Sequence, residues 1–240
     1  CEMCIRDSCH PLEIKRFATG REHNGWVIPH RWQVDTAVIR KDGHVLFDGR
    51  AHPMAVAGSS ASFRGRVDKA ELDRHVFSSR NYPDAYVFHC IFNYRPWESH
   101  WGFCIPWEIY GQWGEGAYDV ELVTRFEPDT MLVGQAWHQG RSAETVVFNA
   151  HTCHCCQAND GLSGVFAILE LFKRLRNRDT RHSYLGVLAP EHIGTVFYLA
   201  DMPRQQREQI KLGCFVEMVG SDTPWALQES FDGQAVITRV

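Results

Sequence analysis

The sequence has no long apolar run, no strong excess of charge of one sign and no repeated or low-complexity segment. No stretch approaches the roughly 20 apolar residues of a membrane helix, and no secretory signal is visible, so we expect no membrane partner. The chain carries 25 Lys and Arg residues against 29 Asp and Glu residues, a net charge of -4. This balance gives no electrostatic reason to expect nucleic acid as a partner.

An initiator methionine is also missing, and the opening CEMCIRDS shows no hydrophobic periodicity. We therefore expect a fragment of a longer protein, in which Cys1 and Cys4 carry no meaning. The chain has nine cysteines, an odd number without the spacing of a disulfide framework. That count favours a reducing, cytoplasmic location.

The amino-acid composition changes along the chain. Residues 26–113 are rich in aromatic residues, His, Pro and Gly, and predict a small, mostly β domain. Within it we expect strands at 33–40, 45–47 and 85–93, and a helix near 68–77. The remaining residues, 1–25 and 114–240, predict a larger α/β domain.

The larger domain alternates apolar runs with helical patterns, which predicts a mixed, largely parallel sheet flanked by helices. Its expected strands lie at 118–126, 132–137, 145–150, 184–189 and 214–219. Its expected helices lie at 162–176, with Leu162, Val165, Phe166, Leu169 and Phe172 on one apolar face, and at 204–211 after Pro203.

Polar side chains follow the three most apolar of these strands. The first strand runs into His151, the second into Glu191 and His192, and the third contains Glu217. Because sites in α/β sheets collect beyond the carboxyl ends of the strands, we expect these side chains to converge on one pocket.

Asp160 follows His151 closely in the segment AHTCHCCQANDGLSG, which runs from Ala150 to Gly164. An imidazole and a carboxylate are both zinc ligands. An aspartate directly before a helix also acts as a helix cap, and this alternative stays open at the level of sequence. Together with Glu191 and Glu217, the pattern favours the ligand interpretation for Asp160.

Glu191 is the candidate general base, because a carboxylate beside a metal ion accepts a proton from water at neutral pH. The alternative is a helix-start residue stabilised by the helix dipole. His192 is either a ligand of a second metal ion or a surface histidine.

The cysteines after His151 have several interpretations. One is a closed structural zinc site formed by Cys153, Cys155 and Cys156 with His151 and His154. The spacing argues against it, because structural zinc sites use separated pairs of ligands and these residues crowd one short run. Cys153 is a candidate catalytic residue, although a nucleophile–base pair with its sequence neighbour His154 would be unusual. For Cys155 and Cys156 we expect buried, inert thiols.

The run from His151 to Gly164, followed by the APEHIG segment at 189–194, resembles the uncharacterised aminopeptidase-like proteins encoded near polysaccharide biosynthesis genes. The WVIP segment at 26–29 and the WGFC segment at 101–104 add to the likeness, which covers nearly the whole chain after Pro11. These proteins are in turn similar to the di-zinc aminopeptidases of metallopeptidase family twenty-eight. The resemblance implies a zinc aminopeptidase-like fold, with the small β domain inserted into it.

The resemblance also implies roles for five residues. His151 matches the first metal-binding histidine, and Asp160 matches the aspartate that bridges two metal ions. Glu191 matches the catalytic glutamate, His192 falls at a metal-binding glutamate, and Glu217 falls at an aspartate ligand. One or two zinc ions are therefore implied.

Departures from the peptidase pattern keep other outcomes open. Peptidases carry an aspartate where this chain has Cys153, and His192 replaces a glutamate. One metal ion, two metal ions or a degenerate site all remain consistent with the sequence.

We therefore expect a metal-dependent hydrolase that cleaves an amide or peptide bond in a peptide or small-molecule substrate. A second hypothesis is a deacylase acting on a sugar or cell-surface precursor, and a third is an inactive relative that binds metal or ligand. For the second, aromatic side chains of the β domain would stack on sugar rings, although such residues usually fill a core. The tryptophans concerned are Trp97, Trp101, Trp107 and Trp113.

Overall fold

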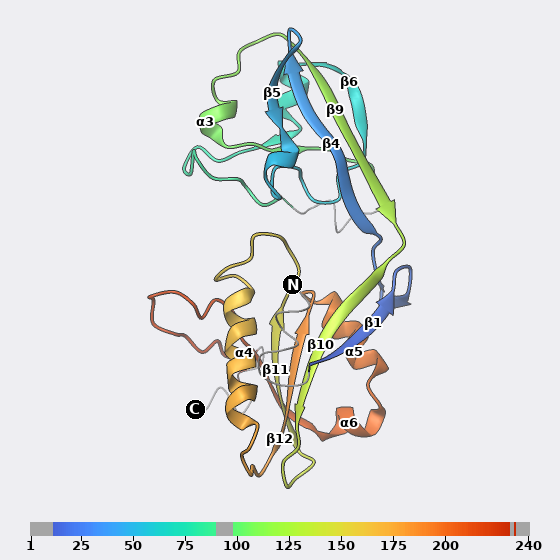
Figure 1. Cartoon of the computed structure of the whole chain (residues 1–240), viewed down its shortest axis with the longest axis vertical. Helices are drawn as coiled ribbons and strands as arrows, with labels where there is room; N and C mark the ends of the chain where they lie inside the picture. The colour runs from blue at the N-terminus through green and yellow to red at the C-terminus, as the bar shows by residue number, and fades with distance from the viewer. Residues whose placement is uncertain (1–11, 90–97, 231–232, 234–240) are drawn as a thin grey trace. The chain divides into compact units, whose positions relative to one another are not determined.

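The structure, a computed structural model, describes residues 12–89, 98–230 and 233. The chain divides into two compact units (Figure 1). The larger unit comprises the described residues of Cys1–Pro29 and Asp129–Val240, and the smaller unit is His30–Pro128. Three residues discussed above, Cys1, Cys4 and Trp97, lie outside the described residues.

The larger unit is built on a five-stranded mixed sheet with the order β1-β10-β12-β11-β13. β1 pairs antiparallel with β10, and β10 pairs antiparallel with β12. β12, β11 and β13 run parallel. The strand bounds are β1 (Glu13–Ala18), β10 (Thr130–His138), β11 (Thr145–His151), β12 (Ser183–Ala189) and β13 (Ile210–Phe215). A short hairpin of β2 (Glu22–His23) and β3 (Trp26–Val27) follows β1.

Helices cover both faces of this sheet (Figure 1). Successive side chains of a strand point to opposite faces. In β12, Leu185 and Val187 pack with α5 (Ile193–Asp201). Leu188 instead packs with α4 (Leu162–Leu175). A short helix, α6 (Arg204–Gln209), leads into β13. No helix of the described residues is long and apolar enough to cross a bilayer.

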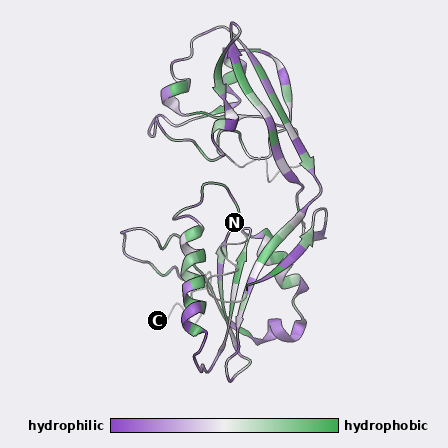
Figure 2. Cartoon of the chain, viewed as in Figure 1, coloured by the Kyte–Doolittle hydropathy of each residue, from purple (hydrophilic) through white to green (hydrophobic). Residues whose placement is uncertain are grey.

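The buried face of α4 differs from the expected one. Val165, Ile168 and Phe172 are buried, whereas Phe166 is 66% exposed. At about 100° per residue, Val165, Ile168 and Phe172 lie within about 60° of one another around the helix, whereas Phe166 lies more than about 100° from their centre and faces solvent. Toward the end of α4 the ribbon becomes hydrophilic (Figure 2), because Lys173 and Arg174 occupy the last turn.

β13 also differs from the expected strand at 214–219. It begins at Ile210, directly after α6, and ends at Phe215. Within the described part of the chain it pairs with β11 only, and its residues alternate between intermediate and exposed. Glu217 therefore lies in the coil beyond the strand, because the chain turns toward the start of α4 instead of continuing the ladder.

Gly164 allows α4 to pack closely against this coil. A Cβ atom at Gly164 would lie 2.0 Å from the backbone oxygen of Val216, next to Glu217. We expect Gly164→Ala to lower the free energy of unfolding by about 1–3 kcal/mol, because overpacking outweighs the helix propensity of alanine. Urea unfolding of the full-length protein measures this change.

Gly213→Ala is the matched control, because nothing lies within 4 Å of a Cβ atom at that position. It is expected to leave the unfolding midpoint close to that of the unsubstituted protein. Equal stability of the two variants would contradict the close approach of α4 and the coil at Val216.

The smaller unit contains an antiparallel sheet with the order β5-β4-β9-β6. Its strands are β4 (Arg31–Lys41), β5 (His44–Asp48), β6 (Phe63–Asp68) and β9 (Ala117–Glu127). The parallel pair of β7 (Val76–Phe77) and β8 (Phe103–Cys104), the 3-10 helix η1 (Gly49–Ala51), α2 (Lys69–Asp73) and α3 (Trp107–Tyr110) complete the unit.

The predicted bounds of this unit, 26–113, differ from the observed 30–128. The reason is β9, which was assigned to the larger domain but pairs with β4 and β6. The expected helix near 68–77 ends at Asp73, and β7 follows it. The expected strand at 85–93 is absent from 85–89, its described part.

The described tryptophans of the sugar-stacking hypothesis belong to the core of the smaller unit. Trp101 is 8% exposed and stacks on His75, with ring centroids 3.7 Å apart. Trp107 and Trp113 pack against the same core cluster. Their burial favours a structural role over a stacking platform.

Candidate metal centre

The carboxyl ends of the three parallel strands position the predicted ligands. His151 is the last residue of β11 and pairs with Ala189, the last residue of β12. Glu191 follows Ala189 after one proline, and Glu217 lies two residues beyond the end of β13. The predicted residues therefore start from one edge of the sheet, as expected for an α/β site.

His151, Asp160 and Glu217 meet at this edge. The His151 Nε2 atom lies 2.9 Å from Asp160 Oδ1 and 2.6 Å from Glu217 Oε2. The His151 side chain is 5% exposed, that of Glu217 is 24% exposed and that of Asp160 is 56% exposed. The group therefore combines one imidazole and two carboxylates, which are ligand types of zinc, and it is partly accessible to solvent.

Glu217 is oriented by two backbone groups. The N–H groups of Gly161 and Met218 both donate to Glu217 Oε1, each at 2.9 Å. The other oxygen, Oε2, is buried and has no hydrogen bond. It lies at ion-pair distance from His151 Nε2, but without hydrogen-bond geometry. An orphaned, buried carboxylate oxygen is costly, and a bound cation would satisfy it.

The coil that carries Glu217 is held to the first turn of α4 and to the loop before it by further hydrogen bonds. The Val219 N–H donates to Ser163 Oγ at 3.0 Å, and the Gly220 N–H donates to Asn159 Oδ1 at 2.8 Å. These contacts explain why the coil reaches the site without strand pairing.

Asp160 does not cap α4. The cap residue is Gly161, which has a φ of 87° and makes no side-chain capping bond. A positive φ suits glycine, so the chain turns sharply between Asp160 and the helix. The carboxylate of Asp160 faces His151 instead, which supports the ligand interpretation over the cap.

Cys153 contacts the other side of the His151 ring. Its Sγ atom lies 3.0 Å from His151 Nδ1, and the Gln157 side-chain nitrogen lies 3.3 Å from the same atom. Burial raises the pKa of the Cys153 thiol, and the nearby Glu191 and Asp160 carboxylates add to the rise. A thiol that stays protonated at neutral pH argues against the nucleophile hypothesis for Cys153.

His154 was not among the metal ligands predicted at the strand ends. Its Nε2 atom lies 3.4 Å from Asp160 Oδ1, and its ring centroid lies 5.9 Å from that of His151. The signal in the sequence was the His-x-Cys-His spacing, but a crowded run gives no information on which side chains turn inward.

Glu191 and His192 lie beside the metal set and do not join it. Contact between Cys153 and the backbone and carboxylate of Glu191 places Glu191 next to the cluster. The His192 ring stacks on Trp26, with centroids 6.2 Å apart, and its side chain is 67% exposed. The ligand role of His192 stays a prediction that this arrangement does not support.

Cys155 and Cys156 correct another expectation. Both side chains are exposed and not buried. They lie on the loop between β11 and α4, where Cys156 adopts a positive φ of 57° and the chain turns away from the sheet.

The fold of the chain is similar to those of a peptidase-like protein and of zinc aminopeptidases. The crystal structure of a "putative peptidase" from Clostridium acetobutylicum aligns with 92% of this chain and 51% of that chain, with a TM-score of 0.79 and 24% identity. A zinc aminopeptidase from Bacillus subtilis aligns with 88% of this chain and 60% of that chain, with a TM-score of 0.59 and 12% identity. The predicted fold class, a mixed sheet flanked by helices as in zinc aminopeptidases, is confirmed.

Sequence comparison gives the family. A Clostridium acetobutylicum protein named "Putative polysaccharide biosynthesis protein with aminopeptidase-like domain" is 25% identical over 211 residues, or 88% of this chain. The chain spans about half of that relative, 48% of its length. Residues 3–240 match the family described as "Domain of unknown function (DUF4910)", and the chain belongs to this family. The predicted resemblance is thereby confirmed.

Proposed function

We propose that this protein is a zinc-dependent hydrolase of an amide or peptide bond. The observation that carries the proposal is the convergence of His151 Nε2, Asp160 Oδ1 and Glu217 Oε2 at one edge of the sheet. The aminopeptidase-like fold and the name of the relative support a peptidase-like hydrolase. A single imidazole with two carboxylates leaves room for water and substrate at a catalytic zinc ion.

The three side chains would hold the ion, and the fit rests on the orphaned Glu217 Oε2 atom. A bound zinc ion polarises a carbonyl oxygen and lowers the pKa of water to about 7. Asp160 is the most exposed of the three side chains, so the substrate approaches on its side. His151 and Glu217 are held more deeply and define the floor of the site.

Glu191 acts as the general base. It takes a proton from the attacking water and passes it to the nitrogen of the leaving amine. Its side chain stays outside the two groups of potential ligands among the described residues, so its carboxylate is available for proton transfer. The contact of Cys153 with Glu191 on one side and with His151 on the other supports this role.

Removal of the metal tests this proposal directly. We expect zinc to co-purify with the full-length protein, and chelation to lower amide hydrolysis by about 100-fold or more, since the ion supplies several kcal/mol. Added zinc should restore the rate. Full activity in protein shown by elemental analysis to hold no metal would overturn the proposal.

A sugar or cell-surface amide is a second candidate substrate, favoured by the name of the Clostridium acetobutylicum relative. Aminoacyl anilides and N-acylated sugars, assayed with the same zinc-loaded protein, separate the two. Faster hydrolysis of anilides supports the aminopeptidase-like activity, and faster hydrolysis of acylated sugars supports the deacylase. A zinc-loaded protein that cleaves neither class is an inactive relative.

A further inference from the structure

The loop after β11 carries two neighbouring cysteines that the proposed mechanism does not use. The side chains of Cys155 and Cys156 are both exposed. Partial burial of the Cys155 thiol, and after it the contact with the thiol of Cys156, raise the pKa of Cys155. Small solutes therefore reach a pair of thiols that already contact each other.

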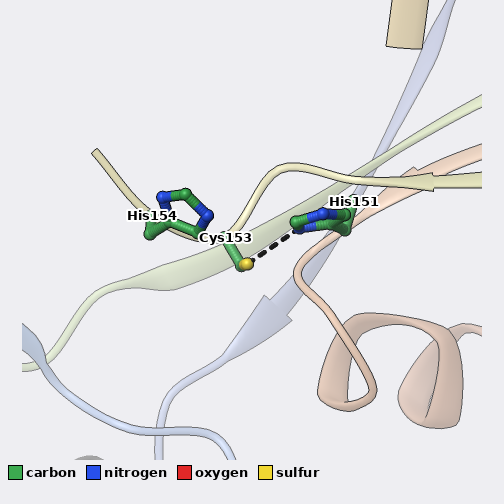
Figure 3. A group of neighbouring side chains, drawn as sticks. All are labelled: His151, Cys153 and His154. Atoms are coloured by element: carbon green, nitrogen blue, oxygen red, sulfur yellow. Dashed lines mark hydrogen bonds between the residues drawn. The ribbon is translucent and has the colours of Figure 1, made fainter. Parts of the chain in front are cut away.

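The backbone carbonyl between these two cysteines holds a histidine beside the candidate metal centre. His154 Nδ1 donates to the backbone oxygen of Cys155 at 2.9 Å, since a carbonyl oxygen only accepts hydrogen bonds. Figure 3 shows His154 on the loop next to Cys153, whose thiol is directed at the His151 ring. The other ring nitrogen of His154, Nε2, lies 3.4 Å from Asp160 Oδ1. A movement of the Cys155 carbonyl would therefore change the position of His154 relative to Asp160.

A disulfide between the two cysteines would require the peptide between them to turn. Consecutive Cα atoms are about 3.8 Å apart across a trans peptide, whereas disulfides usually join Cα atoms about 4.4–6.8 Å apart. The bond closes a small ring that contains the Cys155 carbonyl carbon, so the carbonyl oxygen turns away from His154 Nδ1. Cys156 has a φ of 57°, in the left-handed region that side chains disfavour, so local backbone preference does not oppose this turn.

We propose that Cys155 and Cys156 form a redox modification site, at which a reversible disulfide between them releases His154 from Asp160. A disulfide with unfavourable geometry is easier to reduce than a structural one, and exposure adds to this lability. Such a bond suits reversible modification. It requires neither a metal ion nor hydrolytic activity, and only its effect on zinc rests on the proposed function.

A small-molecule disulfide such as oxidised glutathione serves as the oxidant. One protein thiolate attacks a sulfur atom of the oxidant, which releases one glutathione thiolate and leaves a mixed disulfide. The second protein thiolate attacks the protein sulfur of this mixed disulfide and releases the second glutathione thiolate. The protons of the two cysteines pass to the two glutathiones. The cysteine pair thereby loses two electrons, which the oxidant gains.

Mass spectrometry of the full-length protein tests the bond. The protein is reduced, incubated with oxidised glutathione and digested, and the peptide that contains the loop is weighed. We expect this peptide to lose the mass of two hydrogen atoms and to regain it with dithiothreitol. Cys155→Ser and Cys156→Ser should abolish the loss and keep a glutathione adduct instead, because the second thiol is missing.

Two control variants assign the bond. Cys153→Ser should still lose two hydrogen atoms from the loop peptide, because both bonded cysteines remain. Cys214→Ser, a substitution in β13, should behave like the unsubstituted protein. A loop peptide that stays reduced, or a loss that persists in Cys155→Ser, would overturn the inference.

Nuclear magnetic resonance of the histidine rings tests the release of His154 in metal-free protein. The His154 signals, assigned by their absence in His154→Gln, should shift on oxidation and return on reduction. His182 is the matched control, because its Nδ1 atom lies 3.6 Å from Glu144, at the opposite end of the sheet. A disulfide that forms without a shift of the His154 signals would overturn the proposed release.

The zinc-loaded protein separates this inference from the proposed function. Oxidation should lower zinc affinity by about 10–100-fold, the usual cost of losing a residue that orients a ligand. Equal affinity in both redox states would show that His154 does not act on the metal centre. A disulfide that shifts His154 in a protein that binds no zinc would support the modification site and contradict the proposed function. Zinc-dependent hydrolysis in a protein whose loop stays reduced would do the reverse.

Discussion

Replacing Glu191 by glutamine is expected to lower the rate of amide hydrolysis by about 10²–10⁴-fold, the usual contribution of a general base. Glutamine keeps the size of the side chain but cannot accept the proton of the attacking water. Because Glu191 lies outside both groups of potential metal ligands in the described part of the chain, the bound metal should stay at the level of the unsubstituted protein. The turnover rate and the metal content of one preparation are measured together.

Glu144→Gln is the control for this experiment. Glu144 immediately precedes β11, at the end of the strand opposite His151, and its nearest ionic partner is His182 at 3.6 Å. Its substitution should leave the rate within about twofold, since exposed ion pairs contribute little. An unchanged rate in Glu191→Gln, with metal bound, would remove Glu191 from the mechanism.

The second large effect is expected for Glu217→Gln on metal affinity. Glutamine keeps an oxygen that accepts from the N–H groups of Gly161 and Met218, so the coil should stay in place. It loses the negative charge that Oε2 presents to His151 and to the ion. We expect the affinity for zinc to fall by about 100-fold or more, beyond the roughly 10–100-fold cost of losing a residue that only orients a ligand.

Competition with a chromophoric chelator measures this affinity. Glu170→Gln is the matched control, because Glu170 is a surface carboxylate of α4 whose partners are Lys173 and Arg174. Its zinc affinity should equal that of the unsubstituted protein. Equal affinity in Glu217→Gln would show that Glu217 is not a ligand.

The apolar patterns of the larger unit predicted most of its framework. The expected strands 145–150 and 184–189 became β11 and β12, and the expected helix 162–176 became α4. Local sequence determines these elements. The strands consist of β-branched and other apolar residues, and α4 has apolar residues at helical spacing. The strand ends then placed His151 and Glu191 at one edge of the sheet.

The errors arose where local pattern and tertiary pairing disagree. β9 has the pattern of any amphipathic strand, and only its pairing with β4 and β6 assigns it to the smaller unit. The apolar run around Glu217 resembles a strand, but the N–H groups of Val219 and Gly220 donate to Ser163 in α4 and to Asn159 in the loop before it, away from the sheet.

The sequence by itself determined the kinds of donor atoms, the parallel strands that carry them and the family likeness. Only the tertiary structure decided which donors meet: Glu217 from a coil and His154 from a crowded loop join His151 and Asp160, while His192 turns to Trp26. The physical reason is that the periodicity of apolar residues indicates only which side of a helix or strand is buried. The direction of a side chain in a loop depends instead on hydrogen bonds from distant segments, such as those that orient Glu217.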